Sequence, residues 1–299
     1  MELSFSTGML GSRMSYADMA ALAAKCGFTA LDCMLENMIR SDSPFLQENW
    51  KEYTESVLAD FRAAGLTCNQ THAPFSFGRD AFLNKTIFRE RVFPALVRSL
   101  EISGMLGAKV AVVHPLHYYH NYGDREDVFQ QNMDFYRSLL PYAKEYGVKL
   151  GVENMWDRDP RTRYITHDTC SRKEELARYV DALDSPWAVA CLDIGHVGLA
   201  HQEDEAWDVI RHLGHDRLQA LHIHDNDYIG DLHGTIYSGK IDWRQVTKAL
   251  GEIDYQGDFT YEVGGSYFAH MEDEFIPVAL KYLGDTAKFL QARIEAQRS

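Results

Sequence analysis

The sequence has few cysteines and no long apolar run. Its five cysteines are an odd number and include no close pair of the metal-binding kind, so we expect reduced thiols. No apolar run approaches the roughly 20 residues that a membrane-spanning helix requires. The opening residues lack the basic and apolar regions of a signal peptide. The sequence therefore favours a cytoplasmic protein without a membrane partner.

Positive charge is also scarce. The 299 residues include 44 Asp and Glu against 30 Lys and Arg, which gives a formal net charge of −14, and no Lys/Arg cluster is present. A surface of this kind repels nucleic acid and anionic membranes. The composition therefore argues against a nucleic-acid partner. It is compatible with a small, uncharged substrate and leaves a homo-oligomer open.

A linker and a phosphate-binding turn are absent as well. No Pro-, Gly- or Ser-rich stretch divides the chain, so we predict that residues 1–299 form a single domain. Hydrophobic residues make up 45% of the chain, which suffices for a sizeable core. An open, doubly wound sheet is the alternative to a closed barrel. It usually has a Gly-rich turn after an early strand, and this sequence has none.

A short apolar segment followed by a longer amphipathic one recurs eight times. The apolar segments lack clean alternation, which is typical of parallel strands buried on both faces. Several expected helices end at glycines that suit a left-handed cap, such as Gly27 and Gly107. Eight such units predict an α/β fold, a closed (β/α)₈ TIM barrel. The expected strands are Leu3–Thr7, Ala30–Met34, Thr67–His72, Lys109–His114, Lys149–Asn154, Ala188–Asp193, Leu218–His224 and Phe259–Val263.

Ligand-type side chains lie at or just beyond the C-terminal ends of the last six expected strands, where such barrels carry their chemistry. Any one of them has a structural explanation, as a hydrogen-bonded histidine or a helix-capping glutamate. Gathered at one mouth, however, unpaired carboxylates would repel strongly. A divalent cation neutralises them most simply, because carboxylates and imidazoles are its usual ligands. The candidate residues are His72, His114, Glu153, Asp193, His196, His222, Asp231, His233 and Glu262.

The order of these motifs resembles the xylose isomerase-like TIM barrel superfamily. This group (AP endonuclease family 2) includes sugar isomerases and epimerases as well as endonuclease IV-type DNA-repair enzymes. Between Gln70 and Gly264 the motifs are THAPF, VVHP, GVEN, LDIGH, HIHDND, DLH with GKIDW, and YEVG. Each motif is short, but the ordered set is specific.

The resemblance to ketose epimerases implies a single metal held by four residues, Glu153, Asp193, His222 and Glu262. It also implies that Glu153 and Glu262 are catalytic and exchange protons with a sugar from opposite faces. His196 matches a substrate-binding histidine of that family.

The resemblance to the endonuclease IV-type enzymes implies additional metals. His72 and His114 would then join Glu153 at a second ion. A third ion would be held by His196, Asp231 and His233. In a sugar enzyme the same residues would instead contact the substrate.

Two neighbouring residues match no ligand position, and we assign both to the substrate pocket. His224 lies next to the expected seventh-strand ligands and is interpreted as a residue of the pocket wall or one that supports a ligand. Trp156 follows the fifth strand and could give a sugar an apolar face, or it could pack the barrel rim.

Three functions follow from this pattern. The first is a metal-dependent sugar isomerase or epimerase of carbohydrate metabolism, which transfers a proton beside a carbonyl through a metal-bound enediolate. The second is a lyase or dehydratase that acts on a keto-sugar or keto-cyclitol at the same site. The third is an abasic-site phosphodiesterase. The set of Glu153, Asp193, His222 and Glu262 favours Mn²⁺, with Mg²⁺ or Co²⁺ as alternatives. The two sets that contain more histidines suit Zn²⁺.

Overall fold

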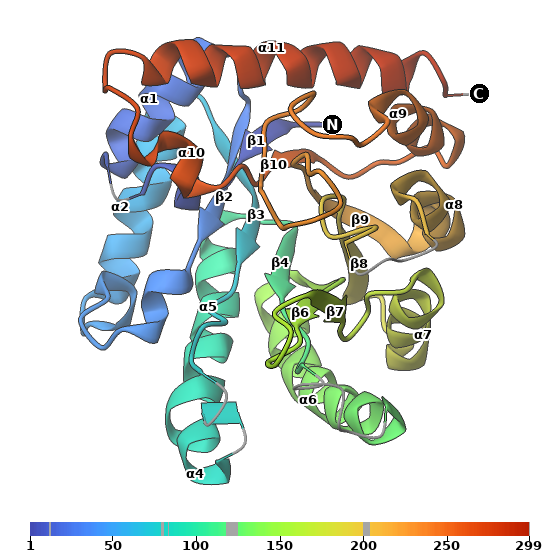
Figure 1. The fold of residues 1–299 in the computed structure, drawn as a ribbon. Helices are drawn as coiled ribbons and strands as arrows, with labels where there is room; N and C mark the ends of the chain where they lie inside the picture. Colours follow the sequence, from blue (N-terminus) through green and yellow to red (C-terminus); the bar gives the residue numbers. More distant parts are fainter. Residues whose placement is uncertain (12, 79–80, 83, 118–124, 200–203, 299) are drawn as a thin grey trace.

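The computed structural model describes residues 1–11, 13–78, 81–82, 84–117, 125–199 and 204–298 (Figure 1). Eight parallel strands form its centre. Six of them make one sheet in the order β2-β3-β4-β5-β8-β9, and β1 pairs with β10. Their bounds are β1 Leu3–Phe5, β2 Ala30–Met34, β3 Thr67–His72, β4 Val110–Val113, β5 Lys149–Glu153, β8 Ala188–Asp193, β9 Leu218–His222 and β10 Phe259–Tyr261.

Two parallel bridges close the ring of strands. Ser6 pairs with Asp32 on one side, and Ile223 pairs with Tyr261 on the other. The amide of Ser6 also donates to the carbonyl of Tyr261 at 2.8 Å. The eight strands therefore form a closed barrel, and the predicted TIM barrel is confirmed.

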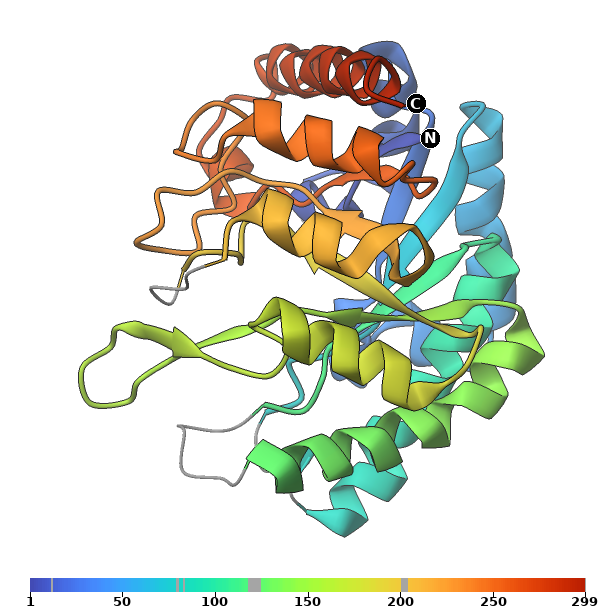
Figure 2. The ribbon, with the colours of Figure 1, turned by 90° about the vertical axis from the view of Figure 1, so that its right-hand side faces the viewer.

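The helices surround the strands (Figures 1 and 2). The last helix, α11, extends along the outside and packs against α1 and α9, so the two ends of the chain meet. The helices are α1 Tyr16–Cys26, α2 Trp50–Ala63, α4 Lys85–Ile87, α5 Phe93–Leu106, α6 Arg125–Tyr146, α7 Lys173–Leu183, α8 Ala206–Arg217, α9 Trp243–Glu252, α10 Gly265–Ala269 and α11 Ile276–Glu295; a π-helical turn, η4 Phe88–Val92, joins α4 to α5, and the short 3₁₀ segments are η1 Thr7–Met9, η2 Glu36–Ile39 and η3 Pro44–Leu46.

Local sequence signals account for where α1 begins and ends. The Ser15 side chain accepts a hydrogen bond from the amide of Asp18 and caps the helix. Gly27 ends it with a φ of 95°, a left-handed conformation that favours glycine. Gly107 and Gly147 have φ values of 81° and 70° after their helices.

Several strands are shorter than expected at their C-terminal ends. The sequence predicts a strand to His224, but β9 ends at His222. The chain turns away there because Asp225 and Gly234 exchange two backbone hydrogen bonds of 2.9 Å. The candidate ligands therefore lie at the rim, where strands give way to loops.

An antiparallel hairpin follows β5 and was not expected from the sequence. Its strands are β6 Trp156–Arg158 and β7 Ile165–His167. Figure 2 shows the hairpin extending away from the barrel on the side of the loop that follows β9. Trp156, a predicted pocket residue, lies at its base. Among the described helices, none is long and apolar enough to cross a membrane.

The inside of the barrel has an apolar half and a polar half. Val110, Val112, Val189, Cys191 and Ala220 form a separate buried cluster from β4, β8 and β9. The polar half comes from β1, β2, β3 and β10. There, Ser4 Oγ and Asn69 Nδ2 both donate to Thr260 Oγ1, at 2.9 and 3.1 Å. The buried polar residues of this half are Ser4, Asp32, Asn69, Gln70 and Thr260.

Candidate functional site

The structure brings all nine predicted ligand residues to one end of the barrel. Among the described residues they form four groups in which the potential ligand atoms lie within 4.8 Å of one another. One of these, His72, His222 and Glu262, combines members of two others. We call the remaining three the inner, β3–β4 and loop groups. The inner group is Glu153, Asp193, His222 and Glu262; the β3–β4 group is His72, His114 and Glu153; the loop group is His196, His224, Asp231 and His233.

The inner group has His222 between two glutamates. His222 Nδ1 lies 2.9 Å from Glu153 Oε1 and 3.2 Å from Glu262 Oε2. The side chain of Glu153 is 1% exposed and that of Glu262 is 16% exposed. Asp193 is fully buried. Its backbone carbonyl accepts a hydrogen bond from Asn154 Nδ2, and its backbone amide donates one to Asn154 Oδ1. Glu262 is therefore the carboxylate of this group that a small molecule reaches most easily.

In the β3–β4 group, two imidazole nitrogens approach one carboxylate. His114 Nε2 lies 3.1 Å from His72 Nε2 and 3.0 Å from Glu153 Oε2. The ring of Phe75 stacks on His114 with centroids 4.3 Å apart. Beside them lies an apolar cavity of about 250 Å³ that Leu116 and Phe135 also line.

The loop group includes one histidine more than the sequence predicted. His233 Nε2 lies 2.9 Å from Asp231 Oδ2, and His196 Nε2 lies 3.8 Å from the same oxygen. The added residue, His224, is fully buried and stacks on His233 with ring centroids 4.0 Å apart. Its Nε2 also lies 3.0 Å from Asp193 Oδ1. His224 thus connects the loop group to the inner group.

Backbone carbonyls fix the orientation of three histidines. The Nδ1 atoms of His72, His196 and His233 bond to the carbonyls of Ala73, Asn154 and Glu262, at 2.9, 2.8 and 2.6 Å. A carbonyl only accepts, so each Nδ1 carries the hydrogen. Nε2 is then the ring atom that faces the carboxylates, and a bound metal would take its lone pair in place of a proton.

The electrostatics of the site fit a bound cation. Burial alone would raise the pKa of Glu153, but His222 and His114 outweigh it and hold that pKa well below its usual range. Burial would lower the pKa of His196, but Asp193 and Asp231 raise it to about 10. The carboxylates of Glu153, Asp193 and Asp231, whose pKa values are all lowered, are therefore ionised at neutral pH.

Two carboxylate oxygens provide a direct test of that fit. Asp231 Oδ1 is buried without a hydrogen bond to any residue that the structure describes. Glu153 Oε2 is buried with only imidazole nitrogens beside it, His114 Nε2 at 3.0 Å and His72 Nε2 at 3.6 Å. A buried, ionised oxygen without a partner is costly. A divalent cation would satisfy both atoms, so these residues suit a metal.

Asp32 is a site-proximal carboxylate that the sequence analysis missed. It lies on β2, is fully buried, and has no hydrogen-bond partner for either carboxyl oxygen among the described residues. Burial raises its pKa to about 6, and the charges of His222 and His72 oppose that rise. The only sequence signal is one acidic residue inside an otherwise apolar strand.

Trp156 and His117 lie around the cluster. The Trp156 ring is edge-on to His196, with centroids 6.3 Å apart, and the Arg158 guanidinium lies 5.2 Å from the Trp156 ring centroid. His117 bonds to the buried carboxylate of Asp168, so it supports the pocket wall and stays outside the three groups.

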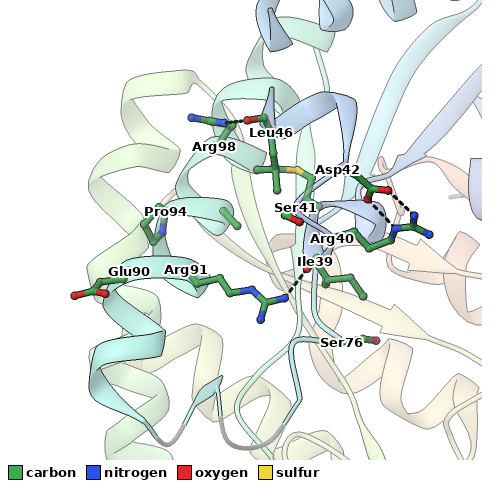
Figure 3. A pocket seen from close by; sticks show the side chains of 12 residues that line it. Ile39, Arg40, Ser41, Asp42, Leu46, Ser76, Glu90, Arg91, Pro94 and Arg98 are labelled. Carbon is green, nitrogen blue, oxygen red and sulfur yellow. Dashed lines mark hydrogen bonds and ion pairs between the residues drawn. The ribbon is translucent and has the colours of Figure 1, made fainter. Parts of the chain in front are cut away.

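A separate hollow of about 990 Å³ lies between α5 and the segment after β2 (Figure 3). None of the nine candidate ligands lines it. Its arginines are already engaged: Arg91 and Arg98 donate to the carbonyls of Ile39 and Leu46, and Arg40 pairs with Asp42. This hollow is therefore distinct from the ligand cluster.

Comparison with known proteins finds one matching family and several similar sequences. The model of the xylose isomerase-like TIM barrel family matches residues 20–286. An uncharacterised protein of Methanocaldococcus jannaschii is 29% identical over 194 residues, which are 64% of this chain and 62% of that one. The mannonate dehydratase of Thermotoga maritima is 26% identical over 141 residues, 45% of this chain. The chain thus spans less than two thirds of the former and 38% of the latter.

Solved structures share the fold over nearly the full chain. A D-psicose 3-epimerase determined in the presence of D-fructose has a TM-score of 0.73 at 15% identity and covers 98% of this chain and 99% of its own. The 3-keto-D-glucoside 4-epimerase of E. coli has a TM-score of 0.70 at 18% identity, with 98% and 99% coverage. At these identities the likeness establishes the barrel.

Proposed function

Because the chain belongs to the xylose isomerase-like TIM barrel family, we propose that it is a metal-dependent sugar isomerase or epimerase. The observation that carries this proposal is the approach of Glu153 and Glu262 to the same atom, His222 Nδ1, at 2.9 and 3.2 Å. Two carboxylates that share one site can move a proton from and to a substrate carbon. The sugar-epimerase names of the structural relatives support this chemistry.

Four residues would hold the catalytic metal: Glu153, Asp193, His222 and Glu262. A divalent ion there would supply positive charge beside the carbonyl of a sugar and lower the energy of the enediolate. Three carboxylates and one imidazole suit Mn²⁺ best, with Mg²⁺ or Co²⁺ next. The histidine-richer β3–β4 and loop groups suit Zn²⁺ if they bind ions at all.

The two glutamates would transfer the proton from and to the substrate carbon. One carboxylate takes the proton from the carbon beside the carbonyl and becomes a carboxylic acid, and the electron pair of the broken C–H bond forms the enediolate. In an epimerase the other glutamate, in its acid form, returns a proton on the opposite face. Exchange with solvent then restores both protonation states. The greater exposure of Glu262 favours it as the group that exchanges with solvent.

The surroundings favour an uncharged sugar. Trp156 offers an apolar ring face next to His196, and sugars commonly rest their C–H faces on such rings. The histidines outside the inner group would contact the hydroxyls. The net charge of −14 would oppose a highly anionic substrate.

We also propose a cytoplasmic enzyme of carbohydrate metabolism. All five cysteines are free and buried, which fits a reducing compartment.

A dehydratase is the second candidate, and the mannonate dehydratase relatives favour it. Abstraction of the same proton, followed by loss of a β-hydroxyl as water, would give an unsaturated product. An abasic-site phosphodiesterase ranks third. The gathered β3–β4 and loop groups favour it, and the acidic composition opposes it.

Product analysis distinguishes the three. The metal-loaded protein should be incubated with D-psicose, D-tagatose, D-fructose and D-mannonate, and separately with abasic duplex DNA. A sugar of unchanged mass and altered stereochemistry supports the proposal. A product lighter by one water would replace it with the dehydratase, and cleavage of the duplex would replace it with the phosphodiesterase.

A further inference from the structure

We propose that Asp32 is a positioning residue, which accepts the hydrogen bond of His222 Nε2 through a buried water and so aims His222 Nδ1 at the metal. This inference rests on the inner group as the metal site of the proposed function. It concerns a residue beneath that group, on a strand that contributes none of the nine candidate ligands.

The strand geometry places Asp32 inside the barrel. Its neighbour Cys33 faces outward, because Cys33 Sγ lies 3.9 Å from the hydroxyl of Tyr16 on α1. Successive residues of a strand point to opposite faces, so Asp32 points inward. Its register partner on β3 is Gln70, where the register shifts by one residue. Asp32 thus joins the polar half of the interior.

Because Nδ1 of His222 faces the cluster, Nε2 is the nitrogen that would carry the ring hydrogen. Nδ1 faces Glu153 and Glu262, so a bound metal takes the Nδ1 lone pair and the ring hydrogen moves to Nε2. The His222 side chain is 0% exposed, and Nε2 has no hydrogen-bond partner among the described residues. A buried N–H of this kind needs an acceptor.

Asp32 is the charged acceptor available on that side. Both its carboxyl oxygens lack a partner in the described part of the chain. Asp32 pairs with Ser6, whose amide donates to the Tyr261 carbonyl, and Tyr261 pairs with Ile223, the residue after His222. These pairings bring Asp32 and His222 to neighbouring levels of the barrel.

No direct hydrogen bond joins Asp32 and His222 in the described structure, so the proposal places one buried water between them. Asn69 Oδ1 and Gln70 Nε2, also buried and unpartnered, would supply that water with further partners. Buried waters typically make about three hydrogen bonds to such groups.

A carboxylate behind a metal-bound histidine fixes the tautomer and makes the ligand nitrogen more basic. Loss of such a partner typically weakens metal binding about 10- to 100-fold. The inference therefore predicts an effect on metal affinity that needs no substrate.

Mn²⁺ titration of the full-length protein tests this role. Asp32→Ala removes the acceptor, Asp32→Asn keeps an acceptor oxygen without the charge, and Ser4→Ala removes a buried hydroxyl from the same interior. We expect Asp32→Ala to lower the Mn²⁺ affinity roughly 10- to 100-fold, Asp32→Asn to recover part of that loss, and Ser4→Ala to leave the affinity unchanged. Wild-type affinity in Asp32→Ala would overturn the inference. Equal losses in Asp32→Asn and Asp32→Ala would show that only charge matters and would overturn it too.

A measurement on the wild-type protein tests the His222 tautomer on which the inference depends, even if the variants fail to fold. In Zn²⁺-loaded protein, the ¹⁵N signals of the His222 ring should show a protonated, slowly exchanging Nε2. An Nε2 without hydrogen would contradict the inference. The two proposals fail differently: normal Mn²⁺ binding without sugar turnover contradicts only the proposed function, and an Asp32-independent Mn²⁺ affinity contradicts only the positioning role.

Discussion

Gly195 lies against the ring of His224. A Cβ at this position would be 1.9 Å from His224 Cε1, so Gly195→Ala must displace a ring whose Nε2 lies 3.0 Å from Asp193 Oδ1. We expect the variant to lose about 1–3 kcal/mol of unfolding free energy. We also expect a Mn²⁺ affinity at least about tenfold weaker, because the support of a ligand is disturbed.

Thermal unfolding and Mn²⁺ titration measure the two effects. Gly230→Ala is the matched control, since the nearest atom to its new Cβ would be at an ordinary 3.6 Å. If Gly195→Ala and Gly230→Ala bind Mn²⁺ equally well, His224 does not support the inner group.

Trp156 is expected to act on the sugar alone. Its ring faces His196 at the edge of the cluster, so Trp156→Ala should raise KM for a ketose about fivefold, equivalent to ~1 kcal/mol of lost ring contact. Trp156→Phe should retain most of the affinity. Steady-state kinetics with parallel Mn²⁺ titrations test this. An unchanged KM in Trp156→Ala would leave the residue as packing of the rim.

Residue identity could be predicted where position limits the choice. Glu153, His222 and Glu262 lie near the C-terminal ends of predicted strands, and parallel strands bring those ends together. The orientation of the histidine rings depends on distant carbonyls, so no local sequence pattern reveals it. Asp32 could not be predicted as part of the site, because the lack of a hydrogen-bond partner for its carboxylate depends on the register of β2 and β3.

At the scale of the single element, the Ser15 cap of α1 allows a prediction outside the site. Ser15 Oγ lies 3.1 Å from the amide of Asp18, and loss of such a cap typically costs about 1 kcal/mol. Ser15→Ala should therefore lower the unfolding free energy by that amount and leave Mn²⁺ affinity unchanged. Ser56→Ala, an exposed position inside α2, serves as the control. Equal stability of the two variants in denaturant titrations would contradict the capping role.

The type and order of the barrel elements could be predicted, whereas some boundaries and one hairpin could not. Hydrophobic periodicity and the glycines at helix ends mark the eight repeated units. Strand ends depend on long-range contacts such as the Asp225–Gly234 pair. The β6–β7 hairpin has three-residue strands, too short for a periodic signal.

For the whole molecule, we predict that a bound metal stabilises the folded protein against unfolding. A ligand that binds only the folded protein at 100 times its Kd adds about 2.7 kcal/mol to the unfolding free energy. Treatment with a chelator should therefore lower Tm, and Mn²⁺ should restore it. Glu153→Gln should lose most of this response, because Glu153 belongs to both the inner and the β3–β4 groups. A Tm that is indifferent to chelator and Mn²⁺ would contradict a metal site.

Proton exchange at the substrate carbon tests proton transfer by Glu153 and Glu262 most directly. The Mn²⁺-loaded protein is incubated with a ketose in deuterated water, and deuterium at the carbon beside the carbonyl is followed by NMR. We expect metal-dependent incorporation in the wild type and none in Glu153→Gln or Glu262→Gln, because these two carboxylates flank His222 and move the proton. Deuterium incorporation that persists in both variants would contradict the proposed proton transfer by Glu153 and Glu262.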